Sequence, residues 1–175
     1  HLFKSPRGCD NLVFANARSD VETYADLLAR RCERAKVANE FWPHHGSLAK
    51  DVREVVEAQL KDRTRPVTAV CTSTLEMGID IGSVARIAQI GPPPSVASLR
   101  QRLGRAGRRG EPAVLRMYVT EKELDIRSAP AGELRCSLVQ TVAMVRLLLE
   151  RWLEPSDDAG LNLSTLIQQV LSVLA

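Results

Sequence analysis

Short apolar runs that alternate with helix-like segments are the feature of this sequence that most constrains its fold. Runs rich in apolar residues cover residues 12–15, 67–71, 84–90 and 113–119, and such runs are typical of strands buried on both faces of a sheet. Strands that alternate with helices imply right-handed crossovers and a mainly parallel sheet covered on both sides. The sequence therefore predicts a three-layer α/β/α domain over residues 10–125.

Serine residues mark where the helices are expected to begin. Ser19–Glu22 fits a capping box at the start of a first helix. Ser47 is predicted to cap a second helix, whose expected buried stripe consists of Val52, Val55, Val56 and Leu60. Pro43 favours an extended segment before the second helix, and a short helix is expected from Ser95, after three consecutive prolines.

The last part of the chain, residues 133–175, changes to helical periodicity alone. Apolar residues recur at helical spacing over residues 138–152 and again over 163–174, with a polar linker at 155–160. We expect an all-helical extension that is the start of a following domain, although it could equally belong to the first. The second stripe runs apolar to the last residue, so the natural chain is expected to continue and to cover this face.

Composition and cysteine spacing narrow the class of protein. Hydrophobic residues make up 45% and charged residues 26% of 175 residues, and no apolar run is long enough to span a membrane. The four cysteines are far apart, with neither a C-x-x-C pair nor a histidine at ligand spacing. These features predict free thiols, no zinc site, no membrane contact and a cytoplasmic location.

Five of the ten residues from 100 to 109 are arginine, and no acidic residue follows until Glu111. The net charge of the whole chain is only +3, so this local density is more informative than the total. If the segment is helical, Arg102, Arg105 and Arg108 share one face. A guanidinium is suited to phosphoryl oxygens that gain charge in a transition state. A solvated basic helix is the alternative, but Gly104 and Gly107 would weaken such a helix.

Three further segments carry polar groups at the ends of predicted strands, where ligands gather in parallel sheets. Residues 72–82 offer hydroxyls for phosphate contact and Asp80 for a ribose hydroxyl, although an ordinary loop has the same composition. Arg18 lies next to a helix N-terminus, which favours anions. Residues His44–Ser47 place Gly46 and the Ser47 hydroxyl at a second helix N-terminus. The adjacent histidines are expected to pack or position the backbone rather than bind metal, since no third ligand is evident.

In order and spacing, these segments resemble the motifs of the second RecA-like domain of superfamily 2 DEAD/DEAH-type helicases. Residues 12–18 resemble motif IV, 45–47 the short motif after it, 72–80 motif V and 101–108 motif VI. Two of these segments are most similar in sequence to large-helicase-related (Lhr-type) enzymes: His-His-Gly-Ser-Leu and Thr-Leu-Glu-Met-Gly-Ile-Asp-Ile-Gly. The resemblance covers residues 10–120 and implies a RecA-like fold for them.

The resemblance also implies roles for individual residues. Arg105 and Arg108 resemble arginine fingers that reach the γ-phosphate of ATP, and Gln101, where DEAD-box proteins have His, resembles a residue linking the two motor domains near that phosphate. Gly78 and Asp80 resemble the nucleotide-facing end of motif V. The residues implied to contact the nucleic-acid backbone are Arg18, Gly46, Ser47, Thr72 and Ser73.

Two sequence patterns of nucleotide-driven motors are missing from these 175 residues. The chain has no G-x-x-x-x-G-K-[ST] phosphate loop, and no Asp-Glu pair followed by a further acid or His, the pattern of the magnesium site in such motors. We therefore expect ATP and Mg²⁺ to be bound mainly by a first RecA-like domain of the same chain, and this fragment alone to be inactive. The predicted function is the second motor domain of an ATP-dependent helicase or translocase, acting on DNA more than RNA. The alternative is a degenerate, non-catalytic domain that binds nucleic acid or a protein.

Overall fold

Five parallel strands form the centre of the protein. The computed structural model describes residues 2–4, 6–76, 81–107, 112–121 and 134–155. The strands are β1 (Asn11–Phe14), β2 (Phe41–His44), β3 (Thr68–Cys71), β4 (Arg86–Ile90) and β5 (Val114–Tyr118). Their order is β2-β3-β1-β4-β5, and every pairing is parallel. The predicted sheet is confirmed, with β2 formed where only an extended segment was expected.

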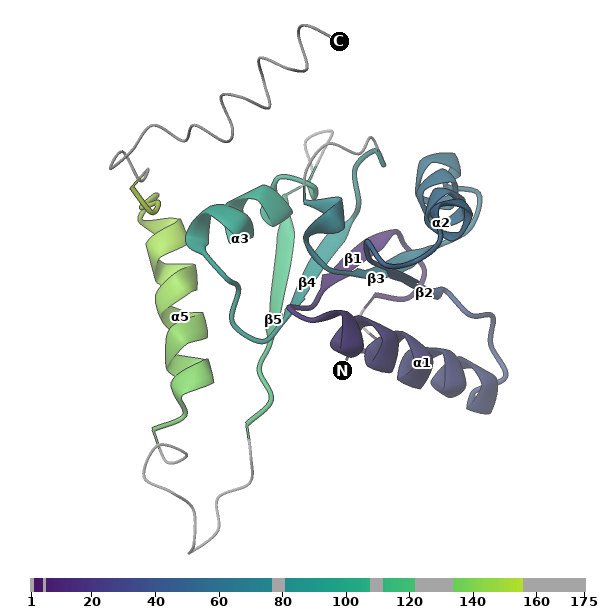
Figure 1. Ribbon diagram of the computed structural model, residues 1–175, viewed down its shortest axis with the longest axis horizontal. Helices are drawn as coiled ribbons and strands as arrows, with labels where there is room; N and C mark the ends of the chain where they lie inside the picture. The colour runs from purple at the N-terminus through teal and green to yellow at the C-terminus, as the bar shows by residue number, and fades with distance from the viewer. Residues whose placement is uncertain (1, 5, 77–80, 108–111, 122–133, 156–175) are drawn as a thin grey trace, which may run out of the picture.

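Helices cover both faces of this sheet (Figure 1). They are α1 (Arg18–Arg34), α2 (Lys50–Asp62), the 3-10 helix η1 (Ser73–Leu75), α3 (Val96–Leu103) and α5 (Cys136–Leu149). The α1 helix lies on one side of the sheet, whereas α2 and α3 lie on the other. The predicted three-layer α/β/α architecture is therefore confirmed.

The core divides into two apolar clusters, one on each face of the sheet. Alternate residues of β1 point to opposite faces, so Leu12 and Phe14 join the cluster under α2, while Val13 joins the cluster under α1. All four residues of β1 and of β3 are buried. The central strands are thus fixed from both sides, and the loops at their ends are held on a rigid base.

Both predicted helix caps, Ser19 and Ser47, are wrong. The α1 helix begins after Ala17 and α2 after Ala49, and neither has a side-chain cap. Ser19 lies inside the first turn of α1. Ser47 lies two residues before the N-cap position of α2, and its Oγ accepts a hydrogen bond from Arg18 instead. Ser95, where a short helix was expected to begin, is the cap of α3, because its Oγ accepts a hydrogen bond from the Ser98 amide at 2.9 Å.

The expected buried stripe of α2 is only half correct. Val56 and Leu60 are buried, but Val52 and Val55 are 45% and 53% exposed. The α2 helix packs over the edge strand β2 at the margin of the sheet. Part of its apolar face therefore extends beyond the sheet, where no described residue covers it.

The helical extension begins as predicted with α5, which packs beside α3. Its apolar side chains are exposed or only partly buried, and Thr141 is its one buried residue. Glu154, beyond α5, accepts hydrogen bonds from the Val96 and Ala97 amides at 2.6 and 3.0 Å. This carboxylate joins the extension to the N-terminus of α3. Residues 156–175, with the second predicted stripe, lie outside the described residues.

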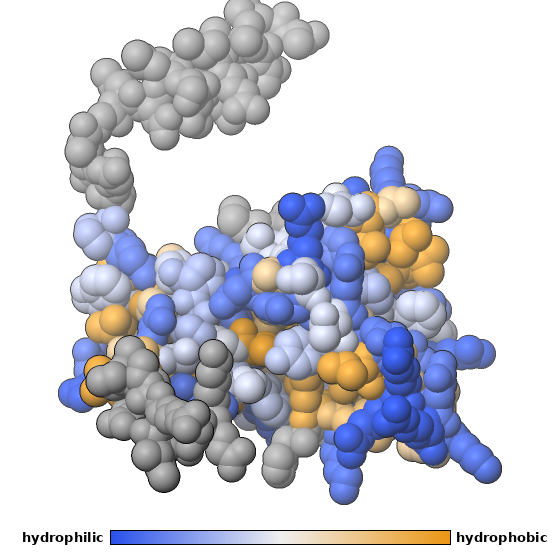
Figure 2. All heavy atoms as spheres, turned by 60° about the horizontal axis from the view of Figure 1, so that its bottom comes forward, coloured by the Kyte–Doolittle hydropathy of each residue, from blue (hydrophilic) through white to orange (hydrophobic). Residues whose placement is uncertain are grey.

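The surface carries exposed apolar side chains among polar ones. Figure 2 shows hydrophobic patches between hydrophilic areas on the face seen there. Among the described residues, no helix has the length and apolar character needed to cross a membrane. No disulfide joins the four cysteines, all of which are described.

Candidate functional site

An open hollow lies at the carboxyl ends of β1, β2 and β3. Its volume is about 580 Å³, and it is lined by Asn16, Ala17, Arg18, Gly46, Ser47 and Thr72. Four of these six residues were predicted from the sequence to contact a nucleic-acid backbone. The fifth predicted residue, Ser73, does not line the hollow but is exposed and adjoins Thr72 in the chain. The parallel sheet thus brings together three segments that are far apart in the sequence.

One hydrogen bond joins two of these segments directly. Arg18 Nη1 donates to Ser47 Oγ, and both residues are exposed. Arg18 is also the first residue of α1, whose N-terminal amides carry partial positive charge. A guanidinium, a hydroxyl and a helix N-terminus in one open hollow suit an anion such as a phosphate.

The buried residue His44 connects two of the segments that line the hollow. Its buried ring lies between Thr74 Oγ1 and Glu57 Oε1, with Nδ1 and Nε2 each 2.9 Å from their partner oxygens. Its backbone carbonyl also accepts a bond from the Thr72 amide at 3.3 Å. His44 therefore ties the segment ending in Ser47 to the one beginning at Thr72. The sequence indicated positioning for the histidine pair but did not identify these partners.

The neighbouring His45 is also buried but has a weaker partner. Its Nε2 lies 3.1 Å from Glu22 Oε1, in a geometry that does not make a hydrogen bond. Within the described residues, no group of three or more His, Cys, Asp or Glu side chains is placed to hold a metal ion.

The predicted shared helical face of Arg102, Arg105 and Arg108 is wrong. The α3 helix ends at Leu103, so Arg102 lies inside it and Arg105 lies in the turn that follows. Arg108 lies outside the described residues. Gly107 has φ +74°, and a Cβ there would be 2.5 Å from the Ala113 amide nitrogen. The backbone turns at Gly107, which prevents one helix from carrying all three arginines.

Arg102 is an internal structural residue and not a phosphate ligand. It is 2% exposed. Its Nε donates to Glu76 Oε1 at 2.7 Å, its Nη2 donates to the same oxygen, and its Nη1 donates to Gln89 Oε1. The guanidinium carbon also lies 4.7 Å from the centre of the Phe14 ring. This structural role of Arg102 depends on contacts with β1, β4 and the residue after η1, which the spacing of the arginines does not reveal.

Arg105 is only partly buried and occupies a different environment. Its Nε and Nη2 both donate to the backbone carbonyl of Glu76, at 3.0 and 2.7 Å. Its own carbonyl accepts a bond from Val84, just ahead of β4, and Ala106 forms a β-bridge with Val84. The backbone of Arg105 lies at the amino-terminal end of β4.

The other predicted nucleotide-facing residues are only partly described. Gln101 is exposed in the last turn of α3. Gly78 and Asp80 lie outside the described residues, as Arg108 does. Cys71, which directly precedes Thr72, is fully buried, and this burial raises the pKa of its thiol far above the ordinary value. The thiol therefore stays protonated and is a core group and not a nucleophile.

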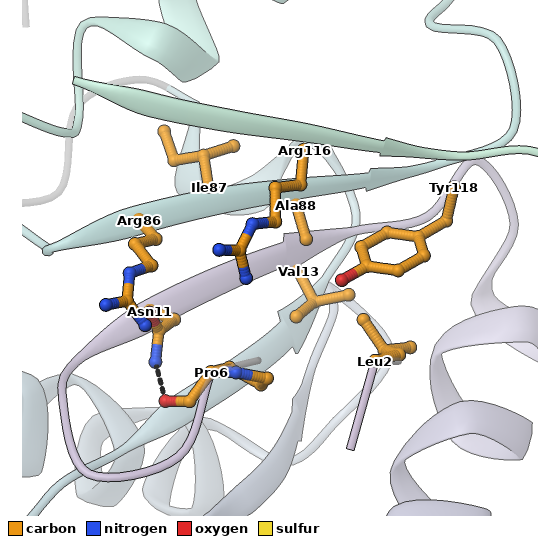
Figure 3. A pocket seen from close by; sticks show the side chains of 9 residues that line it. All are labelled: Leu2, Pro6, Asn11, Val13, Arg86, Ile87, Ala88, Arg116 and Tyr118. Carbon is orange, nitrogen blue, oxygen red and sulfur yellow. Dashed lines mark hydrogen bonds between the residues drawn. The ribbon is translucent and has the colours of Figure 1, made fainter. Parts of the chain in front are cut away.

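A second cavity lies on the α1 face of β4 and β5, beneath the first residues of the chain (Figure 3). Arg86 and Arg116 come from these neighbouring strands, and Leu2 and Pro6 close the cavity from the other side. Its volume of about 10 Å³ has room for one water molecule. It is therefore too small for a nucleotide.

Residues 1–110 match the family described as the helicase conserved C-terminal domain. The chain is 43% identical over 98 residues to ATP-dependent helicase Lhr-Core protein 2 of Thermococcus barophilus, covering 56% of this chain and 11% of the relative. It is 55% identical over 65 residues to a Lhr helicase/probable uracil glycosylase of Mycolicibacterium smegmatis, covering 37% of this chain and 4% of the relative. The chain thus spans only a small part of these relatives.

Solved structures show the same fold. The Mycobacterium smegmatis helicase Lhr bound to ssDNA and AMP-PNP superposes with a TM-score of 0.70 and 30% identity, over 87% of this chain and 18% of that one. The DUF1998 helicase MrfA bound to DNA and AMPPNP gives 0.62 and 26%, over 83% and 19%. The C-terminal domain of a DEAD-box protein gives 0.55 at 17% identity, over 79% and 69%, which shows the fold alone.

Proposed function

The chain belongs to the family of helicase conserved C-terminal domains, and from that premise we propose that it is the second motor domain of an ATP-dependent, Lhr-type nucleic-acid helicase or translocase. Its proposed partners are one nucleic-acid strand and a first RecA-like domain of the same chain. Two helicase structures that it resembles at 30% and 26% identity contain DNA. We therefore propose DNA as the preferred nucleic acid.

The hollow at the carboxyl ends of β1–β3 is the observation that carries this proposal. Four of the five residues that the family resemblance assigned to strand contact come from three segments and line this one open surface. Arg18 supplies a permanent positive charge, Ser47 a hydroxyl, and the N-terminus of α1 its amides. Such groups bind phosphate oxygens, which carry no sequence information. Binding should therefore show little sequence preference and weaken steeply with salt.

The proposed role in hydrolysis belongs to Arg105 and Arg108, with Gln101 near the interface between the domains. ATP, as substrate, supplies the phosphoryl group whose oxygens gain negative charge during transfer. The donors of this chain fit that charge, because guanidinium groups offer several N–H donors in a fixed plane. Arginine fingers accelerate phosphoryl transfer by roughly 10³- to 10⁵-fold.

Binding of ATP and Mg²⁺ is proposed to rest mainly with the first motor domain. The sequence of this chain contains no phosphate loop, and its described residues contain no metal-binding cluster. Gly78 and Asp80 are proposed to face the nucleotide from this side. We expect these 175 residues alone to hydrolyse no ATP.

Strand displacement by the complete protein tests the proposed function. Matched DNA and RNA duplexes with single-stranded tails would be incubated with ATP, and with a non-hydrolysable analogue as the control. The expected result is displacement that requires ATP hydrolysis and is faster on DNA. Binding without ATP-dependent displacement or translocation would instead indicate a degenerate binding module and would refute the proposal.

A further inference from the structure

Glu76 holds two different arginines through two different groups. Its carboxylate Oε1 accepts hydrogen bonds from Ser98 Oγ at 3.0 Å and from Arg102 Nε at 2.7 Å. Its backbone carbonyl accepts from Arg105 Nε and Nη2 at 3.0 and 2.7 Å. One residue thus connects the body of α3 to the turn that follows it.

The carboxylate side of this connection is rigid. Glu76 is 9% exposed and Arg102 is 2% exposed, so their ion pair is shielded from water. Arg102 is further held by Gln89 on β4 and by the Phe14 ring on β1. Moving Glu76 would separate two buried charges, and a buried charge without its partner is strongly unfavourable. The carbonyl that binds Arg105 is therefore fixed relative to the sheet.

The same short segment reaches the hollow at the strand ends. Thr72 lines the hollow, η1 follows, and the Glu76 amide closes η1 by donating to the Ser73 carbonyl at 3.0 Å. Glu76 therefore lies only four residues from the proposed strand contact while it binds Arg105. This arrangement goes beyond filling the core, because a core ion pair has no need to bind a partly exposed guanidinium.

We propose that Glu76 is a positioning residue for Arg105, and that Ser98 and Arg102 act on Arg105 through it. This inference rests on the proposed function, in which Arg105 stabilises the transferred phosphoryl group. Glu76 does not touch the substrate. It fixes the carbonyl on which the Arg105 guanidinium rests, so that the donors of Arg105 are held in one orientation. Substitution of the Glu76 side chain keeps the carbonyl group itself but removes the contacts that hold it in position, so Arg105 can shift with it.

The test uses ATP hydrolysis by the complete protein with saturating single-stranded DNA. Three variants weaken the contacts of the Glu76 carboxylate to different degrees. Ser98→Ala removes one hydroxyl, Arg102→Lys keeps the positive charge but loses the planar guanidinium, and Glu76→Gln removes the negative charge. Arg100→Lys is the matched control, because Arg100 lies on the same helix with an exposed side chain. Thermal unfolding of each variant establishes that it is folded at the assay temperature.

The expected result is a fall in kcat of roughly tenfold to a hundredfold for Arg102→Lys and Glu76→Gln, since a catalytic group misplaced by about 1 Å costs this much. Ser98→Ala should show a smaller fall. The KM for ATP and the DNA affinity should stay within about twofold of wild type, because no group that binds either ligand is removed. Arg100→Lys should behave as wild type.

A double-variant comparison separates this inference from the proposed function. In an Arg105→Lys background, the variants of Ser98, Arg102 and Glu76 should cause little additional loss of any remaining kcat. If Arg105→Lys and Arg105→Ala both hydrolyse ATP normally, the proposed role of Arg105 in hydrolysis is wrong. If those variants are impaired but folded Ser98→Ala and Arg102→Lys proteins match Arg100→Lys in kcat, the positioning role of Glu76 is wrong. An equal loss in both backgrounds would also refute it. If Glu76→Gln fails to fold, the two milder variants still decide.

Discussion

The guanidinium of Arg105 rests on the backbone carbonyl of Glu76, to which it donates two hydrogen bonds of 3.0 and 2.7 Å. Three positions earlier, Arg102 is buried on the carboxylate of the same residue. Two arginines that look equivalent in the sequence therefore differ in role. Arg102 is buried in the core of the fold, whereas Arg105 is only partly buried in the turn after α3.

Loss of the Arg18 guanidinium should weaken nucleic-acid binding. In the complete protein, Arg18→Ala removes one proposed phosphate contact, so the slope of log affinity against log salt should fall by about one. The loss should be similar for unrelated strand sequences, because phosphates carry no sequence information. Fluorescence anisotropy over a salt series measures both. Arg34→Ala, an exposed change in the last turn of the same helix, is the control, and an equal effect there would contradict a local contact.

Gly107 and Gly104 should respond differently to substitution by alanine. Gly107→Ala places a Cβ at φ +74° and 2.5 Å from the Ala113 nitrogen. The left-handed backbone alone costs about 1–2 kcal/mol, and the close contact adds to it. Gly104 has φ −62° at the end of α3, so Gly104→Ala should change the free energy of unfolding by less than about 1 kcal/mol. Denaturant unfolding compares them, and equal effects would contradict the described turn.

Removal of the buried Arg102 should destabilise the fold itself. Arg102→Ala leaves the Glu76 carboxylate buried without its partner, which typically costs roughly 3–5 kcal/mol of unfolding free energy. The exposed Arg100→Ala should change it by less than about 0.5 kcal/mol. Chemical denaturation followed by circular dichroism measures both values. A small effect of Arg102→Ala would mean that the ion pair is not buried in solution.

The contact between Glu154 and α3 should depend on pH. Hydrogen bonds from the Val96 and Ala97 amides lower the pKa of this carboxyl below its ordinary value of 4.5. A lowered pKa in the folded state means that the contact stabilises the protein above pH 4.5 and is lost as the pH falls through the folded-state pKa. The difference in unfolding free energy between wild type and Glu154→Gln should therefore shrink on acidification. A difference that grew would contradict the contact.

Much of the fold could be predicted because burial on both faces leaves a local pattern. β1 and β3 each consist of three apolar residues after one polar residue, and the structure buries every residue of both. β2 was expected only as an extended segment, because four residues that include Pro43 carry too weak a strand pattern. The caps failed for a similar reason. Serine spacing fits a cap at several positions, and the tertiary path of the chain selects among them.

The candidate site, too, could be predicted from the sequence only in part. Arg18, Gly46, Ser47 and Thr72 were placed together correctly because the carboxyl ends of neighbouring parallel strands meet at one edge. The separate roles of Arg102 and Arg105 were not predictable from their spacing. They depend on Glu76 and Gln89, which come from other parts of the chain and reach Arg102 only after folding.

Replacement of Arg105 by alanine in the complete protein tests the central claim most directly. Steady-state ATP hydrolysis would be measured with saturating DNA, and DNA affinity would be measured in parallel. If Arg105 stabilises the transferred phosphoryl group, kcat should fall by roughly 10³-fold or more while DNA affinity is retained. Hydrolysis near the wild-type rate in a folded Arg105→Ala protein would contradict the account.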